Sequence, residues 1–279
     1  MRKQILILCL LSSVALSPIK GQYTEIGLSA GASFYSGDLS PSEFGLYLNE
    51  VHPAFGAFAR FNLNKTLALR LGFNLAKVSG DDTHSLNYNR GLAFRSNITE
   101  LSLLAEINLF HIGNYESKGI TPYVFLGAGF FHFNPEAPFD GDYVALQPLG
   151  TEGQGIPAYG EPYQLTQVAF PFGAGLKFQL NETMSINVEL GGRKLLTDYL
   201  DDVSDTFVNY FDILENNGQL AARLSNPSIV DPNDANTIYT RGGEYKDWYF
   251  ISSFTLCFRL AGSGRNAWNN GRGLGCPTF

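Results

Sequence analysis

The stretch Thr166–Leu180, which reads TQVAFPFGAGLKFQL, decides the fold. Every second residue from Val168 to Leu180 is hydrophobic, apart from one alanine, and the positions between them hold small or polar residues. Successive side chains of a β-strand point to opposite faces, so a period of two separates the two faces. The stretch therefore predicts a strand with one apolar face and one face of small and polar side chains.

Seven further segments repeat this alternation, although the segment 121–133 is apolar on both faces. Together with 166–180 they make eight strands, an even number, each near or above the roughly 9–11 residues that a strand needs to cross a bilayer. A soluble β-sandwich would also alternate. The seven segments are 25–35, 54–63, 67–75, 98–110, 121–133, 184–196 and 248–260.

The connections between these segments alternate in length. Short turns are expected at Asn62–Lys65, His111–Gly119 and Asn181–Glu182. Membrane barrels have short periplasmic turns and long extracellular loops, whereas a sandwich has no reason for this asymmetry. We therefore predict an all-β fold, an eight-stranded antiparallel transmembrane β-barrel. Its long loops are expected at 37–53, 79–96, 134–164 and 197–246.

The N-terminus has the features of an export signal. Arg2 and Lys3 precede a short apolar run, Ile5–Leu16, and Gly21 is a small residue suited to cleavage. Past residue 16 no stretch is long and apolar enough for a membrane helix. We expect a signal peptide at 1–21, a barrel at 22–260 and a periplasmic C-terminal tail at 261–279, in a bacterial outer membrane.

Composition excludes some functions. Cleavage at residue 21 would leave 16 basic against 26 acidic residues, a net charge of −10, which argues against nucleic-acid binding. The four histidines have no metal-ligand spacing, and no nucleophile or phosphate-binding motif occurs. We expect no enzyme and no cofactor.

Charged residues fall on the inward-facing positions of the strands. An eight-stranded barrel is just wide enough for side chains to fill it, and buried charges must pair or stay hydrated. The sequence predicts a plug of ion pairs, and the alternative is a narrow pore or proton path. The residues are Glu25, Arg60, Arg70, Glu106, Lys177, Glu189, Arg193 and Arg259.

Four carboxylates cluster after the seventh strand: Asp198, Asp201, Asp202 and Asp205. Such a density could bind Ca²⁺, although the spacing is not that of a calcium-binding loop. The alternative is local structure, for example a short helix capped by Asp205 or Ser204.

Two cysteines remain once the signal is removed, Cys257 in the last strand and Cys276 in the tail. An exported protein can form disulfides. Three states are open: an internal bridge between the two, a bridge from Cys276 to another protein, or two free thiols.

Several of these stretches resemble one family. The run from Gly191 to Ser204, GGRKLLTDYLDDVS, is similar to a segment of the PorG-like outer-membrane barrels of the Bacteroidota type IX secretion and gliding machinery. Arg241-Gly242 followed by KDWYF at 246–250, the start YTEIG at 23–27 with YSGDL at 35–39, and Cys276-Pro277 at the C-terminal end resemble it too.

This resemblance implies a non-catalytic scaffold. It implies an eight-stranded barrel that anchors or organises a periplasmic ring, built from a lipoprotein and its partner subunit. The periplasmic turns and the tail would then be the contact surface, with Cys276 and Pro277 as candidate partner-binding residues. The alternative function is a surface barrel, unrelated to secretion, whose extracellular loops bind a ligand or partner.

Overall fold

The computed structural model describes residues 23–40, 50–82, 89–114, 118–231, 237–243 and 246–260. The expected signal peptide, the C-terminal tail, Cys276 and Pro277 lie outside the described residues. Among the residues that are described, no helix is long and apolar enough to cross a membrane.

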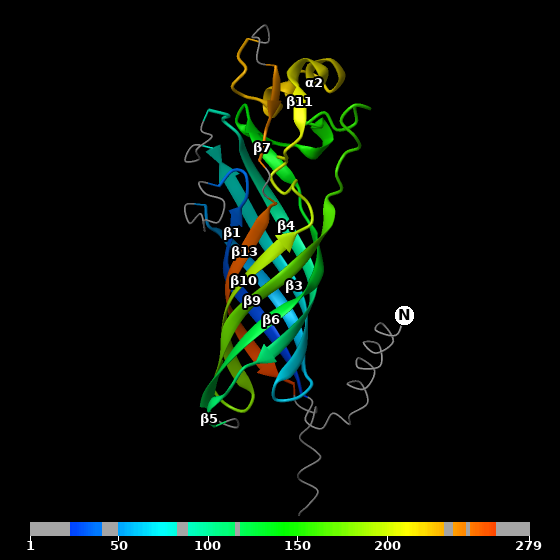
Figure 1. The fold of residues 1–279 in the computed structure, drawn as a ribbon. Helices are drawn as coiled ribbons and strands as arrows, with labels where there is room; N and C mark the ends of the chain where they lie inside the picture. Colours follow the sequence, from blue (N-terminus) through cyan, green and yellow to red (C-terminus); the bar gives the residue numbers. More distant parts are fainter. Residues whose placement is uncertain are drawn as a thin grey trace, which may run out of the picture.

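Eight long strands form a closed antiparallel barrel (Figure 1). Each pairs with the next long strand in the sequence, including β4 with β6, and the pairing of β13 with β1 closes the circle. This confirms the predicted fold class. The strands are β1 (Tyr23–Ser36), β2 (His52–Asn62), β3 (Leu67–Asp81), β4 (Ala93–Asn108), β6 (Lys118–His132), β9 (Thr166–Gln179), β10 (Met184–Leu195) and β13 (Trp248–Arg259).

The outer face of the barrel is apolar. Its leucine and phenylalanine side chains are exposed at alternate positions, while the residues between them face the lumen. A closed barrel leaves no unpaired strand edge, and only such a barrel can span lipid with strands. The chain is thus a barrel of the bacterial outer membrane. The exposed residues include Leu28, Phe55, Leu71, Phe73, Leu101, Leu103, Leu126, Phe130, Phe172, Leu190 and Phe254.

Two tight turns at the periplasmic end are stabilised in the same way, by an asparagine side chain that accepts hydrogen bonds from the backbone. In the β2–β3 turn, Oδ1 of Asn64 accepts hydrogen bonds from the backbone N–H groups of Thr66 and Leu67, at 2.8 and 2.7 Å. In the β9–β10 turn, Oδ1 of Asn181 accepts from the N–H groups two and three residues on, both at 2.9 Å. The third short connection carries β5 (Ile112–Asn114), which folds back on β6.

The other end of the barrel has more regular structure than the eight predicted strands. Strands β3 and β4 run past the predicted ends and stay paired up to Asp81 and Ala93, so the second loop is shorter than 79–96. The alternation of apolar residues fades there because the strands have left the lipid, while the backbone ladder continues. The third and fourth loops contain secondary structure of their own.

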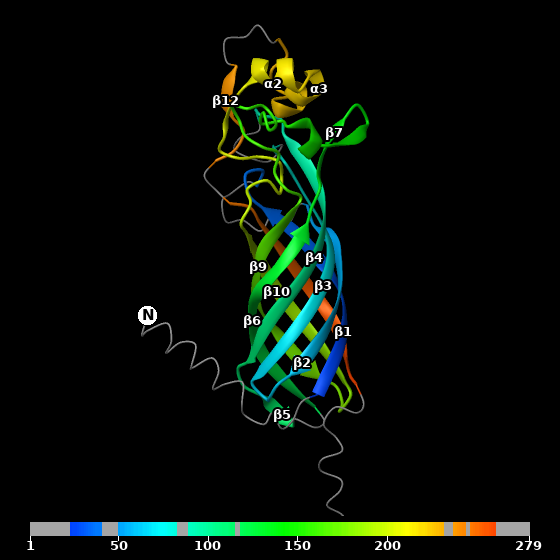
Figure 2. The ribbon, with the colours of Figure 1, turned by 90° about the vertical axis from the view of Figure 1, so that its right-hand side faces the viewer.

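These loops form an extracellular cap over the barrel (Figure 2). The third loop supplies the hairpin β7 (Pro135–Phe139) and β8 (Asp142–Ala145) and the 3₁₀ turn η2 (Gln147–Leu149). The fourth supplies β11 (Phe207–Asn209), α2 (Tyr210–Asn216), α3 (Gln219–Ser225) and β12 (Ile238–Thr240). Val208, Tyr210, Ile213, Ala221 and Ala222 form the small core of this loop.

The predicted helix cap was wrong. Asn209, not Asp205 or Ser204, caps α2, and its side chain accepts from the N–H of Phe211 at 2.9 Å. Ser204 is buried instead, with its hydroxyl donating to Glu152. Asp205 therefore lies well before the first turn of the helix.

Candidate functional site

The lumen holds a continuous chain of ion pairs. Glu106 lies at its centre, with one oxygen 2.9 Å from Nε of Arg60 and 2.7 Å from Nζ of Lys177, and the other 3.2 Å from Nε of Arg70. Arg60 also binds Glu25 at 2.9 Å, and Arg70 binds Glu189 at 2.5 Å. The structure thus brings six of the eight predicted lumen charges into one network.

The remaining two predicted charges lie apart from this network. Arg193 pairs with Glu100, Nε to Oε2, at 3.0 Å. Sequence reasoning missed Glu100, although it lies on the same strand face as Ser102 and Glu106 and is 1% exposed. Arg259 lies over the ring of Tyr23, 3.8 Å from the guanidinium carbon to the ring centre.

Aromatic side chains fill the space between these charges. The guanidinium of Arg70 lies between the rings of Phe58 and Phe125, at 5.0 and 4.9 Å. Gly27 makes room for Phe58 on the neighbouring strand β1, directly across from it, where a Cβ would lie 2.5 Å from the Phe58 ring. These inward rings explain why the segment 121–133 reads as apolar on both faces. The lumen cavity around Arg70 and Glu189 measures about 30 Å³, which is enough to hold water.

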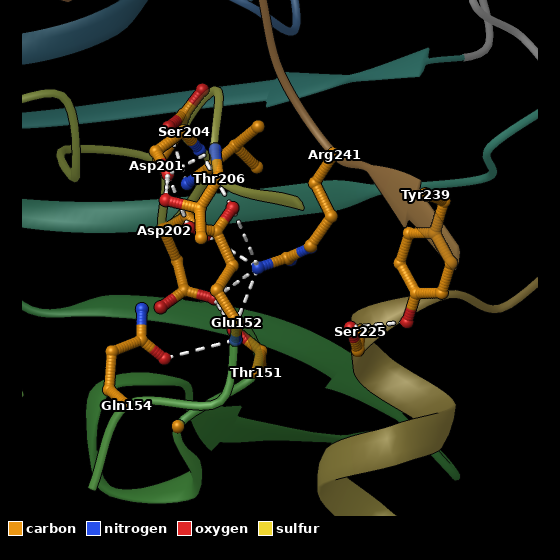
Figure 3. A network of polar contacts seen from close by, with 12 residues as sticks. Thr151, Glu152, Gln154, Asp201, Asp202, Ser204, Thr206, Ser225, Tyr239 and Arg241 are labelled. Atoms are coloured by element: carbon orange, nitrogen blue, oxygen red, sulfur yellow. Dashed lines mark hydrogen bonds and ion pairs between the residues drawn. The ribbon is translucent and has the colours of Figure 1, made fainter. Parts of the chain in front are cut away.

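A second buried network holds the extracellular cap together (Figure 3). Nη1 of Arg241 donates to Thr151 Oγ1 at 2.7 Å and to the carboxylate of Asp202 at 3.0 Å. Tyr163 donates to the other oxygen of Asp202 at 2.6 Å. Glu152 accepts from both the N–H and the hydroxyl of Ser204, at 2.8 and 2.5 Å. The third and fourth loops are therefore joined by side chains that water does not reach.

The first and second loops join the same cap through Arg90. It forms a two-pronged ion pair with Asp82, at 3.0 and 2.7 Å, and donates to the backbone carbonyl of Asp38 at 2.9 Å. The carboxylate of Asp38 accepts from the N–H of Gly243 at 2.9 Å. All four extracellular loops are thus connected.

Acidic side chains in the cap have raised pKa values. Burial raises the pKa of Glu152 to about 7, although Arg241 lies close by. Burial also raises the pKa of Asp198 to about 6. Asp201 and Asp247 lie on either side of the Tyr35 hydroxyl, at 2.5 and 3.1 Å, and burial together with neighbouring carboxylates raises the pKa of each well above its usual range.

The four aspartates considered for Ca²⁺ are not arranged around one point. Asp201 accepts from Tyr35, Asp202 pairs with Arg241, and Asp198 lies 3.8 Å from Nζ of Lys246. Within the described part of the chain, no three His, Cys, Asp or Glu side chains are placed to hold a metal ion. These contacts correspond to the local structure that the sequence left as the alternative.

Two open cavities lie at opposite ends of the barrel. The extracellular groove, of about 590 Å³, runs between the β7–β8 hairpin and the helices of the fourth loop and is lined by Phe139, Tyr210, Leu214 and Arg223 among others. The periplasmic vestibule, of about 340 Å³, lies at the mouth of the lumen.

Cys257 is a free, buried thiol in the wall of the described barrel. Its position does not determine the state of Cys276, which lies outside the described residues.

Comparison with known proteins gives a family and a set of similar structures. The sequence model of a family described as a domain of unknown function, DUF6089, matches residues 2–218. None of the curated proteins matches the chain.

Solved barrels similar to this chain come from several bacteria. The N-terminal β-barrel domain of Pseudomonas aeruginosa OprF is 14% identical with a TM-score of 0.36, covering 86% of this chain and 100% of that one. Neisserial surface protein A is 8% identical with a TM-score of 0.39, covering 86% and 100%. Yersinia pestis Ail, solved with the heparin analogue sucrose octasulfate, is 11% identical with a TM-score of 0.38, covering 86% and 99%. At such identities none of them assigns a role to a residue here.

Proposed function

The chain belongs to the DUF6089 family, and from its filled lumen we propose that it is a non-catalytic scaffold of the outer membrane, a component of a type IX secretion system. In this role it anchors and organises a periplasmic ring made of a lipoprotein and its partner subunit. The proposal rests on the likeness of its GGRKLLTDYLDDVS run and chain ends to the PorG-like barrels, together with the architecture.

The filled lumen is the observation that carries this proposal. Arg60, Arg70, Glu106, Lys177 and Glu189 occupy the middle of the barrel, and the cavity beside them has room for about one water molecule. A cavity of this size can hold water but no larger solute. What the molecule offers to partners is a rigid, membrane-held body with two ends, which is what an anchor requires.

The resembling run supports a structural role for its own residues. Asp201 and Asp202 are 1% and 0% exposed and hold the cap together through Tyr35 and Arg241. Buried groups of this kind bind no external partner. The contact with a ring would accordingly be made at the periplasmic end, by the turns and the tail with Cys276.

The test is association with the periplasmic ring. The protein is extracted in detergent from its own membranes, and co-purifying proteins are identified by mass spectrometry on reducing and non-reducing gels. We expect the ring lipoprotein to co-purify, and a larger band that collapses on reduction and is lost in Cys276→Ser. Deletion of 265–279 should weaken the association while the barrel stays folded, as shown by heat-modifiable migration.

A matched control and a contrary outcome make this test decisive. Cys257→Ser removes the buried thiol in the barrel wall and should leave the larger band in place. An unchanged co-purification profile after both tail changes, with a lone monomer band in both lanes, would exclude the scaffold role.

The extracellular groove favours a second candidate, a surface barrel whose loops bind a ligand or partner. Its aromatic walls are joined by Arg223, whose guanidinium carbon lies 5.1 Å from the ring centre of Phe139. This function would be lost in Arg223→Gln and preserved on deletion of 265–279. The scaffold function requires the reverse.

A further inference from the structure

The periplasmic vestibule has the chemistry of an anion site. Its walls come from the first residue of β1, the last of β13, the β2–β3 turn and the periplasmic ends of β4, β6, β9 and β10. The lining consists of polar, charged and tyrosine side chains, with no aliphatic side chain among them. A cavity of about 340 Å³ with these side chains on its walls offers a polar ligand several groups for hydrogen bonds.

Positive charge predominates in the vestibule. Lys65, Lys177 and Arg259 line it against a single carboxylate, that of Glu25. Glu25 is already engaged, at 2.9 Å from Nη1 of Arg60 and 3.3 Å from the Asn62 amide. Lys177 is likewise engaged, at 2.7 Å from the Glu106 carboxylate, so a ligand site here depends on Arg259.

Arg259 is the fifth cation of a described lumen that holds four carboxylates, and it lies across from Glu25 in the pairing of β1 with β13. Four lumen carboxylates, Glu25, Glu100, Glu106 and Glu189, make ion pairs with Arg60, Arg70, Lys177 and Arg193. Arg259 forms none of these pairs and lies instead on the Tyr23 ring, 3.8 Å from the ring centre. Its Nε is buried and has no hydrogen-bond partner. Buried donors are nearly always satisfied, so this one is open to a ligand.

We propose that the vestibule binds a carboxylate presented by an acidic segment of a periplasmic partner chain, with Arg259 as the principal ligand-binding residue. A guanidinium pairs with a carboxylate through two parallel N–H···O bonds, which makes arginine the suitable side chain for this contact. This deepens the scaffold proposal and rests on it, since it names the chemistry by which a periplasmic partner is held.

Two other sources of an anion fit less well. A lipid headgroup lies against the outer face of the barrel, whereas the vestibule side chains point into the lumen. The chain's own stretch 261–279 contains no Asp or Glu and carries Arg265 and Arg272, so its side chains offer no carboxylate. An acidic segment of another chain is the source that complements the charge.

The experiment uses the full mature protein in detergent micelles and a fluorescein-labelled hexaglutamate peptide, with hexaglutamine as the matched probe. Fluorescence anisotropy at low salt is expected to show binding of hexaglutamate only. Arg259→Gln should weaken it about tenfold, the usual size of a lost charge-assisted hydrogen bond. Arg259→Lys should recover part of the affinity. Arg95→Gln, which removes a cation at the extracellular end, should change nothing.

Equal binding of both peptides or an unchanged affinity in Arg259→Gln would overturn the inference. So would displacement of hexaglutamate by equimolar inorganic phosphate. Tighter binding after deletion of 261–279 would also overturn it, because it would show that the tail occupies the vestibule. Heat-modifiable migration confirms that each variant is folded. No secretion component is present in this assay, so loss of ring association in cells with intact peptide binding would count against the scaffold role alone.

Discussion

Nη1 of Arg241 donates to Asp202 twice, to its backbone carbonyl at 2.6 Å and to its carboxylate at 3.0 Å. Asp202 has a φ of 65°, in the left-handed region that aspartate adopts more readily than most residues. This conformation is held from both sides, since Tyr163 donates to the remaining carboxylate oxygen. Both residues belong to the fourth loop, and the third loop contacts them through Tyr163 and Thr151.

Arg241→Met should loosen the cap without unfolding the barrel. The substitution leaves Asp202 and Glu152 buried with no counter-charge, and removing one partner of such a pair costs about 3–5 kcal/mol. We expect faster proteolytic cleavage within 197–246, measured in micelles, while heat-modifiable migration is unchanged. Arg95→Gln is the control, because the Arg95–Glu136 pair is partly exposed and is worth about 1 kcal/mol or less. Equal cleavage rates in the two variants would contradict this account of the cap.

Glu106→Gln should destabilise the barrel itself. Glu106 pairs with Arg60, Arg70 and Lys177, and the amide leaves these three buried cations with only two carboxylates, Glu25 and Glu189. The expected loss in the free energy of unfolding is about 3–5 kcal/mol, measured by urea titration of the tryptophan fluorescence. Arg193→Gln, in the separate pair with Glu100, is a useful comparison. If the two losses add in the double variant, the pairs are independent, and strong non-additivity would show them to be one network.

The cap should be more stable in mild acid than at neutral pH. The pKa of Glu152 is raised from its usual value of 4.5 to about 7, so the folded cap binds a proton more tightly than the unfolded loop. The contribution is fully present below pH 4.5 and is lost as pH rises through 7. Asp198, with a pKa of about 6, acts in the same direction. Protease resistance of 197–246, probed by pulses at pH 5.5 and 8 with a protease active at both, should fall with rising pH.

Glu152→Gln is the matched variant for this pH dependence. The amide keeps an acceptor for the Ser204 N–H and removes the titrating proton, so the fall in protease resistance between pH 5.5 and 8 should become shallower. A slope identical to that of the wild type would mean that other carboxylates, Asp201 and Asp247 among them, govern the effect.

The two turn asparagines should be equivalent. Asn64→Ala and Asn181→Ala each remove an acceptor of two backbone N–H groups, which are exposed and can turn to water instead. Each change should cost about 1 kcal/mol of unfolding free energy in urea. Asn→Asp at either site keeps the acceptor and should cost less, and a loss as large as that of alanine would argue against the hydrogen bonds.

The membrane-spanning part of this fold could be read from the sequence, because lipid imposes one requirement on every strand. Thr166–Gln179 alternates cleanly for that reason, and the inward positions of Arg60, Arg70 and Glu106 follow from the period of two. The same rule would have found Glu100, which shares a face with Glu106. The ends of the strands could not be predicted from the sequence. Strands β3 and β4 continue beyond the membrane into water, where outward-facing residues need not be apolar.

The cap was not predictable, because its contacts join residues far apart in the chain. Arg241 meets Thr151 across 90 positions, and no local pattern indicates that pairing. Helices α2 and α3 are seven residues each, too short for a helical period to stand out. Asp201 and Asp202 were considered as Ca²⁺ ligands or as part of local structure, and only their partners Tyr35 and Arg241 identify them as interior groups.

The hydrogen bond from Gly243 to Asp38 spans 205 positions and bears on how the molecule is assembled. Asp38 follows β1 and Gly243 precedes β13, and the pairing of these two strands closes the barrel. The bond crosses above that seam and can form only when the first and last strands have both been inserted. The bond therefore forms late in assembly. Once formed, it opposes lateral separation of β1 from β13.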